Sequence, residues 1–151
     1  MKEIFRPPIS TSDTIKKGKY SPVKAILYGL LISVVLASLV SMIESIIFSI
    51  LTKAELGSES QSVTALANSV TFLTINIAVY SVIMYYAGTV VKKFTPSQEA
   101  KFGAIVSTLT FLIYVLLFIG SNSFSEFPVW YNVAVFTSIV VALNYGAKHK
   151  I

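Results

Sequence analysis

The chain has 151 residues, of which 54% are hydrophobic and 13% are charged, and its mean hydropathy is +0.74. Soluble domains carry about a quarter charged residues, so this composition argues against a soluble globular protein. There is no cysteine, which excludes disulfides and Cys-ligated metal sites.

The first 21 residues are polar, contain Pro7-Pro8 and precede the first apolar stretch. No small-residue cleavage site follows that stretch, so it is not typical of a signal peptide. We interpret residues 1–21 as a cytoplasmic N-terminal arm that leads into a retained helix.

Four long apolar stretches follow, and we predict helices at about 23–51, 64–92, 101–120 and 127–147. Each is long enough for the roughly 20 residues that cross a hydrocarbon core about 30 Å thick. The alternating pattern of barrel strands is absent, and the helix is the other structure that satisfies its backbone in lipid. The connections are too short for a soluble domain, so residues 22–151 form one transmembrane domain. The sequence predicts an all-α, polytopic membrane protein with a four-transmembrane-helix bundle.

The positive charge is distributed unevenly along the chain. Of the 12 lysine and arginine residues, only Lys53 lies in the connections after the first and third helices. This positive-inside pattern predicts an N-in/C-in orientation, with both termini cytoplasmic. It also predicts anionic inner-leaflet lipids, and not nucleic acid, as the partner of the lysines. We expect a multi-pass protein of the cell membrane.

Small residues recur every four positions along the first and fourth helices, which lets another helix backbone approach closely. Seven such residues form the row in the first helix: Ala25, Gly29, Ser33, Ala37, Ser41, Ser45 and Ser49. The row in the fourth helix is Ala134, Ser138, Ala142 and Gly146. Two interpretations stay open, packing within the chain and an interface with another chain. The candidate interface residues are Gly29, Ser33, Ala37, Ser41, Ala134, Ser138 and Ala142.

The third helix has few small residues, and we expect it to be the most lipid-exposed.

Four polar residues of the apolar stretches are candidate binding residues: Glu44, Asn68, Asn76 and Asn132. Both Asn76 and Asn132 precede a lysine of the inner boundary by 16 positions, or about 24 Å of helix, which places them in the outer half of the membrane. An ionisable side chain in a membrane helix is costly, so Glu44 raises the hypothesis of proton or cation binding or of a subunit contact. The alternative is an interfacial carboxylate that reaches water or Lys53.

The asparagines also have two interpretations. They form hydrogen bonds between helices, or they converge with Glu44 in one polar pocket that opens to the outside. We expect Tyr80 and Tyr114, near mid-membrane, to hydrogen-bond neighbouring helices. The segments that begin at Asn76 and Asn132 resemble each other (NIAVYS and NVAVFT), which hints at an internal duplication.

No catalytic, nucleotide or phosphate-loop motif is present. The one histidine, His149, lies in the tail between lysines, so an intramembrane haem or zinc site is not expected. We therefore expect a protein that is not an enzyme and has no cofactor and no metal.

Three functions remain open. The first is a non-catalytic accessory or structural subunit of a larger membrane complex, or a homo-oligomer, that associates through small-residue helix faces. The alternative is a small oligomeric channel or transporter with an outer-facing polar site around Glu44, Asn76 and Asn132. Transport ranks second because the cytoplasmic half offers no evident polar residues to continue a path. A lipid-binding role of the basic arm is a third possibility.

Overall fold

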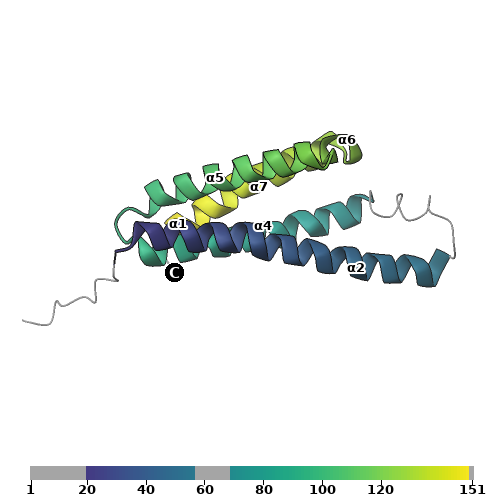
Figure 1. Ribbon diagram of the computed structural model, residues 1–151, viewed down its shortest axis with the longest axis horizontal. Helices are drawn as coiled ribbons and strands as arrows, with labels where there is room; N and C mark the ends of the chain where they lie inside the picture. Colours follow the sequence, from purple (N-terminus) through teal and green to yellow (C-terminus); the bar gives the residue numbers. More distant parts are fainter. Residues whose placement is uncertain (1–19, 57–68, 150–151) are drawn as a thin grey trace, which may run out of the picture.

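The computed structural model describes residues 20–56 and 69–149, and this part of the chain is helical (Figure 1). The first helix is continuous but changes type along its length, with α1 at Pro22–Leu30, a π-helical segment η2 at Leu31–Leu36, and α2 at Ala37–Leu56. The other helices are α4 at Val70–Phe94, α5 at Glu99–Gly120, the short α6 at Ser123–Glu126 and α7 at Val129–Lys148. Most of the predicted arm, residues 1–19, and the predicted start of the second helix, residues 64–68, lie outside the described residues.

Within residues 20–56 and 69–149, four segments are long and apolar enough to cross a membrane: Pro22–Glu44, Val70–Phe94, Glu99–Gly120 and Val129–Lys148. The predicted four-helix membrane fold is confirmed. Large apolar side chains point outward, for example Met42 and Ile50, which are 61% and 63% exposed. Exposed apolar surface of this extent requires a hydrocarbon environment. The chain is therefore a multi-pass membrane protein in contact with the lipid bilayer.

The starts of α1 and α5 and the ends of α4 and α7 meet at one end of the bundle. We call it the basic end, because its helix termini carry Lys24, Lys92, Lys93, Lys101 and Lys148. The backbone N–H of Ser21 donates to the carbonyl of Phe94 at 2.8 Å, and Lys92 donates to the carbonyl of His149. The opposite end, with α6 and the start of α7, is the far end. That the basic end faces the cytoplasm stays a prediction.

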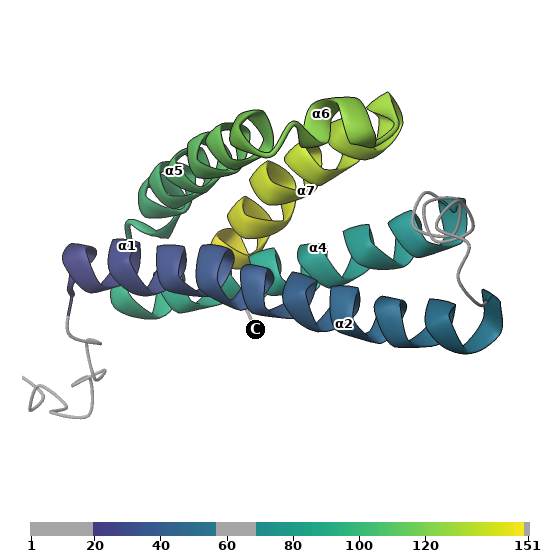
Figure 2. The same cartoon turned by 45° about the vertical axis from the view of Figure 1, so that its right-hand side comes forward.

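The helices form two antiparallel pairs that converge at the basic end and separate toward the far end (Figures 1 and 2). One pair is α1–η2–α2 with α4, and the other is α5 with α7. The parallel helices α4 and α7 join the pairs through direct backbone contact. A Cβ built on Gly88 would lie 2.1 Å from the carbonyl oxygen of Leu143, and one on Gly146 would lie 2.1 Å from that of Tyr85. Only glycine fits at either position, since any side chain would drive the two helices apart.

The small-residue row of the first helix packs within the chain along α1 and η2. Its members Ala25, Ser33 and Ala37 are fully buried. A Cβ on Gly29 would lie 2.8 Å from the side chain of Val91 and 2.9 Å from that of Val106, so α4 and α5 both approach closely here. This part of the row therefore provides close packing inside the bundle.

The expectation that the third helix is the most lipid-exposed was wrong. In the most apolar 18 residues of each span, 33% are buried in α5 and 17% in Pro22–Glu44. Val106, Thr110 and Tyr114 of α5 are buried in the bundle interior. The first helix is the one with the greatest exposure to lipid, because its small residues restrict its packing to one narrow face.

We expect Gly146→Ala to lower the free energy of unfolding by about 2 kcal/mol or more, because the added methyl group would meet the Tyr85 carbonyl oxygen. Titration with SDS in mixed micelles, followed by circular dichroism, measures this change. Gly120→Ala is the matched control, because nothing lies within 4 Å of the position that its added methyl group would occupy, and alanine favours the helix by up to about 1 kcal/mol. Equal stability of the two variants would contradict the backbone contact.

Candidate functional site

Glu44, Asn76 and Tyr131 form one hydrogen-bonded group, the polar triad, that joins α2, α4 and α7. The amide Nδ2 of Asn76 donates to Oε2 of Glu44 at 2.7 Å, and the hydroxyl of Tyr131 donates to Oδ1 of Asn76 at 2.9 Å. Asn76 and Tyr131 are buried, while Glu44 is partly exposed. The triad therefore holds an ionisable group at the edge of the bundle interior, with three helices fixed around it.

The hydrogen bond from Asn76 defines the depth of Glu44. Glu44 follows Lys24 by 20 positions, about 30 Å along a straight helix, which would place it at the far boundary of the core. Asn76 is only about 24 Å of helix away from Lys92. Because the two side chains bond directly, the carboxyl group of Glu44 lies at the level of the Asn76 side chain. The hydrogen bond thus draws the carboxyl group toward the level of Asn76.

A second contact between α2 and α4 lies one helical turn away from the triad. Ser41 and Tyr80 hydrogen-bond through their side chains. Ser41 precedes Glu44 by three positions and Tyr80 follows Asn76 by four, so each pair shares a helix face. The ring of Tyr80 meets that of Tyr114 edge-on at 6.4 Å. Tyr80 and Tyr114 therefore connect the triad with the middle of the bundle.

In the middle of the bundle, polar groups meet at the π-helical segment η2. The hydroxyl groups of Ser33 and Thr110 lie 2.8 Å apart, and both residues are buried. Tyr114 donates its hydroxyl hydrogen to the carbonyl oxygen of Ser33 at 3.2 Å. Single π-helical turns interrupt the regular hydrogen-bond pattern and recur at functional sites. The expectation that Tyr80 and Tyr114 hydrogen-bond neighbouring helices is confirmed.

Polar contacts also occur in the half of the bundle next to the basic end. The amide of Asn144 donates to the hydroxyl oxygen of Ser107 at 2.9 Å and to the carbonyl of Val140 at 2.8 Å. Ser107 lies one turn from Thr110 on α5. The expectation that this half offers no matching polar residues was therefore wrong. The missed signal was the spacing of Ser107 and Thr110, three positions apart on the buried face of α5.

Asn132 does not join the triad, although its sequence surroundings match those of Asn76. Its amide Nδ2 donates to the carbonyl oxygens of Phe124 and Phe127, at 3.3 and 3.4 Å, and so holds the connection around α6. Its Oδ1 is buried and has no hydrogen-bond partner among the residues that the structure describes. The neighbouring Tyr131 takes the place that the sequence suggested for Asn132. Asn68 lies outside the described residues.

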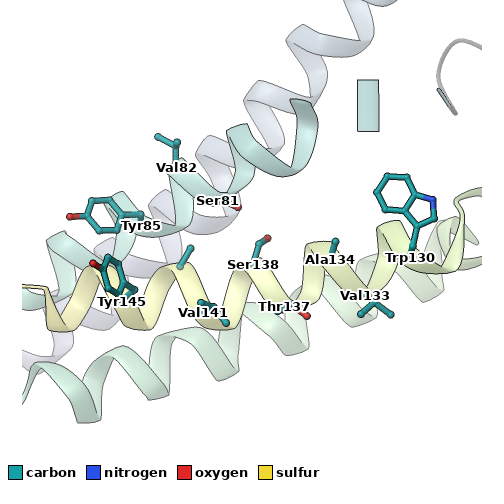
Figure 3. Close-up of a pocket in the computed structure, with 11 residues that line it drawn as sticks. Ser81, Val82, Tyr85, Trp130, Val133, Ala134, Thr137, Ser138, Val141 and Tyr145 are labelled. Carbon is teal, nitrogen blue, oxygen red and sulfur yellow. The ribbon is translucent and has the colours of Figure 1, made fainter. Parts of the chain in front are cut away.

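The candidate interface residues fall into two groups. Gly29, Ser33 and Ala37 are buried inside the bundle, and Ser41 bonds Tyr80, which favours packing within the chain for the first helix. The other three members of the set line an open groove between α4 and α7, the α4–α7 groove, with a volume of about 840 Å³ (Figure 3). These residues are Ala134, Ser138 and Ala142. An interface between chains stays a prediction.

Comparison with known proteins gives no match to a protein family, to a curated protein or to a solved structure. Within residues 20–56 and 69–149, no three His, Cys, Asp or Glu side chains gather so that they could hold a metal ion. Fold alone does not define function, so only the geometry of these side chains bears on it.

We expect Asn76→Leu and Tyr131→Phe to be coupled in a double-mutant cycle, because each removes the same hydrogen bond. Hydrogen bonds between membrane helices contribute about 0.6 kcal/mol on average and at most about 1.7 kcal/mol, and the coupling energy should fall in this range. Unfolding in mixed micelles measures it. The cycle of Asn144→Leu with Tyr131→Phe is the control and should give additive effects, because Asn144 bonds Ser107 at the other end of the bundle.

Proposed function

We propose that the protein is a non-catalytic membrane transport protein, a small channel or carrier, that binds a proton or a small monovalent cation at the polar triad. The observation that carries this proposal is the hydrogen bond from Asn76 to Glu44, which holds a carboxyl group against a buried side chain of the second membrane-spanning helix. Ionisable residues in membrane helices are expensive and most often mark ion or proton pathways.

The chemistry of the triad suits a cation. A carboxylate offers about four acceptor positions on its two oxygens, and the bond from Asn76 uses one of them. The amide and hydroxyl oxygens of Asn76 and Tyr131 lie beside it. Oxygen ligands of this kind suit protons and hard cations. Glu44 is also partly exposed, which leaves a route for exchange on the far side.

Polar contacts deeper in the bundle support transport over a purely structural role. From the triad, hydroxyl and amide groups continue through Tyr80 and Tyr114, then Ser33 with Thr110, to Ser107 with Asn144. The interior of one chain is closely packed around them, with Met84, Val106 and Ile139 fully buried. A path through the bundle therefore requires movement of the helices or a second chain, which fits an oligomeric transporter.

We expect Glu44→Gln to abolish cation-dependent flux in proteoliposomes. Glutamine keeps an acceptor oxygen for Asn76, so the variant removes the charge and leaves the contact in place. Proton entry is followed with an enclosed pH-sensitive dye under an imposed potential, and alkali-cation entry with tracer ions. Glu126→Gln is the control, because Glu126 is exposed on α6 and its replacement should leave flux unchanged. Wild-type flux of both protons and alkali cations through Glu44→Gln would refute the proposal.

A second candidate is the accessory subunit or homo-oligomer, and one observation favours it. Ala134, Ser138 and Ala142 are only partly covered by the rest of the bundle and line the open α4–α7 groove. Leucine at Gly29, Ser33 or Ala37 does not test association, because these residues pack inside the chain and their enlargement would disturb the fold.

Native mass spectrometry of protein extracted gently from its own membranes tests the subunit candidate. Foreign subunits in fixed stoichiometry that are lost from Ser138→Leu would establish it, because leucine would fill the groove without entering the core. Thr108→Leu, on the exposed face of α5, is the control and should retain any partner. A chain with no stoichiometric partner in either sample would contradict the accessory-subunit candidate.

A further inference from the structure

One outer face of the bundle combines an apolar groove with a charged pocket. The α4–α7 groove reaches from Trp130 to Tyr85 and Tyr145 (Figure 3). One turn beyond these tyrosines, on the same two helices, Thr89 and His149 line a second pocket of about 390 Å³ at the basic end. The rings of Tyr145, which lines the groove, and His149, which lines the pocket, lie 5.0 Å apart, so the two hollows are neighbours along α7. We call the second hollow the basic pocket.

The α4–α7 groove has the dimensions and lining of a site for an acyl chain. From Trp130 to Tyr145 it follows 15 residues of α7, or about 22 Å of helix. The acyl chains of one leaflet fill about 15 Å of the hydrocarbon core, so the groove is long enough to hold a whole acyl chain. Its polar lining consists mainly of small hydroxyl groups such as those of Ser81 and Ser138, and the tyrosines at its basic end mark an interfacial level.

The basic pocket has the charges of a phosphate site with an additional acceptor. Lys92 and Lys93 line it, together with Ser97 and Glu99. Lys92 also donates to the carbonyl of His149, which holds its ammonium group at the end of α7. The Oε2 atom of Glu99 is buried and lacks a hydrogen-bond partner within the described part of the chain. A ligand that satisfies this pocket brings a negative group for the lysines and a hydrogen-bond donor for Glu99.

We propose that this face binds one anionic phospholipid with a hydroxyl-bearing headgroup, of the phosphatidylglycerol class. The phosphate lies between Lys92 and Lys93, a headgroup hydroxyl donates to Glu99, and one acyl chain runs past Tyr85 and Tyr145 along the α4–α7 groove. The inference is independent of transport at the triad, which lies at the other end of α4. It assigns a ligand to the groove that the small residues of α7 leave open.

Charge distinguishes this lipid from a transmembrane helix as the occupant of the groove. Membrane helices carry their lysines and arginines at the same side of the membrane. A second copy of this chain, inserted in the same orientation, would bring Lys24, Lys101 and Lys148 to the level of Lys92 and Lys93. Such like charges repel, whereas an anionic headgroup is attracted to this end of the groove.

Native mass spectrometry of the delipidated full-length protein, titrated with lipid, tests the proposal. The probes are phosphatidylglycerol, phosphatidylcholine with the same acyl chains, and glycerol 3-phosphate without chains. We expect phosphatidylglycerol to bind at least fivefold more tightly than phosphatidylcholine, and glycerol 3-phosphate not to bind at comparable concentration. Lys93→Gln should weaken phosphatidylglycerol binding roughly fivefold, since one lysine near an anionic group contributes about that factor. Lys24→Gln, which removes a lysine of the same end outside the pocket, should have no effect.

A second pair of variants tests the groove. Ser138→Phe should weaken the binding of both lipids, because the ring fills the space of the acyl chain, while Thr108→Phe on the exposed face of α5 should not. Equal affinity for the two lipids, or equal effects of Lys93→Gln and Lys24→Gln, would overturn the headgroup assignment. Binding of glycerol 3-phosphate as tight as that of the lipid would overturn the role of the groove. A dimer that Ser138→Phe dissociates, with lipid binding unchanged, would assign the groove to a second chain.

Discussion

The backbone contact between α4 and α7 is the constraint on which the rest of the bundle depends. Gly88 and Gly146 let the two helices touch near the basic end, and this contact joins the two helix pairs. Beyond it, the pairs separate toward the far end (Figure 2). Two consequences follow from the separation. On the inner side of α4 and α7, long polar side chains bridge the pairs, as Tyr131 does when it bonds Asn76. On the outer side, Ala134, Ser138 and Ala142 of α7 are only partly covered and line the α4–α7 groove.

The energies of the interior hydrogen bonds indicate why stability alone does not explain the polar triad. Each bond between membrane helices contributes about 0.6 kcal/mol on average. A carboxylate at the centre of a helix costs about 2.5 to 3.5 kcal/mol, and the cost falls toward the boundary. One bond from Asn76 therefore offsets only part of the cost of Glu44 at its depth. The hydroxyl pair of Ser33 and Thr110 is different, because neutral groups that satisfy each other need no further partner. Of the two, the carboxyl group is the one whose cost its hydrogen bond does not fully offset.

The sequence predicted the four helices because composition and length decide membrane insertion without reference to packing. It also placed Asn76 in the outer half of the membrane, since depth follows from counting residues along a helix, but the same count put Glu44 at the far boundary, and the hydrogen bond between them is a feature of the structure alone. It could not choose between Asn132 and Tyr131, because one position turns a side chain by about 100° and the rotation of α7 is set by its contact at Gly146.

The resemblance between the second and fourth helices also did not predict how these helices pack. The contact relates Gly88 to Gly146, 58 positions apart, whereas the similar segments pair Asn76 with Asn132, 56 positions apart. The resemblance in sequence therefore does not coincide with the local symmetry of the contact.

The parallel helices α4 and α7 thus carry a different feature on each side, and both features depend on how the two helices pack. The interior side carries Asn76 and Tyr131 of the triad, and the outer side carries the groove. The triad lies beyond the glycine contact, where the helices separate, and the groove extends from that part to Tyr85 and Tyr145 beside the contact. A change in the angle between α4 and α7 would alter the distance that the Tyr131 hydroxyl spans and the width of the groove together. At the basic end the distance between α4 and α7 cannot change with this angle, because the two helices touch through their backbones. The angle between α4 and α7 therefore sets both the width of the groove and the distance from Tyr131 to Asn76.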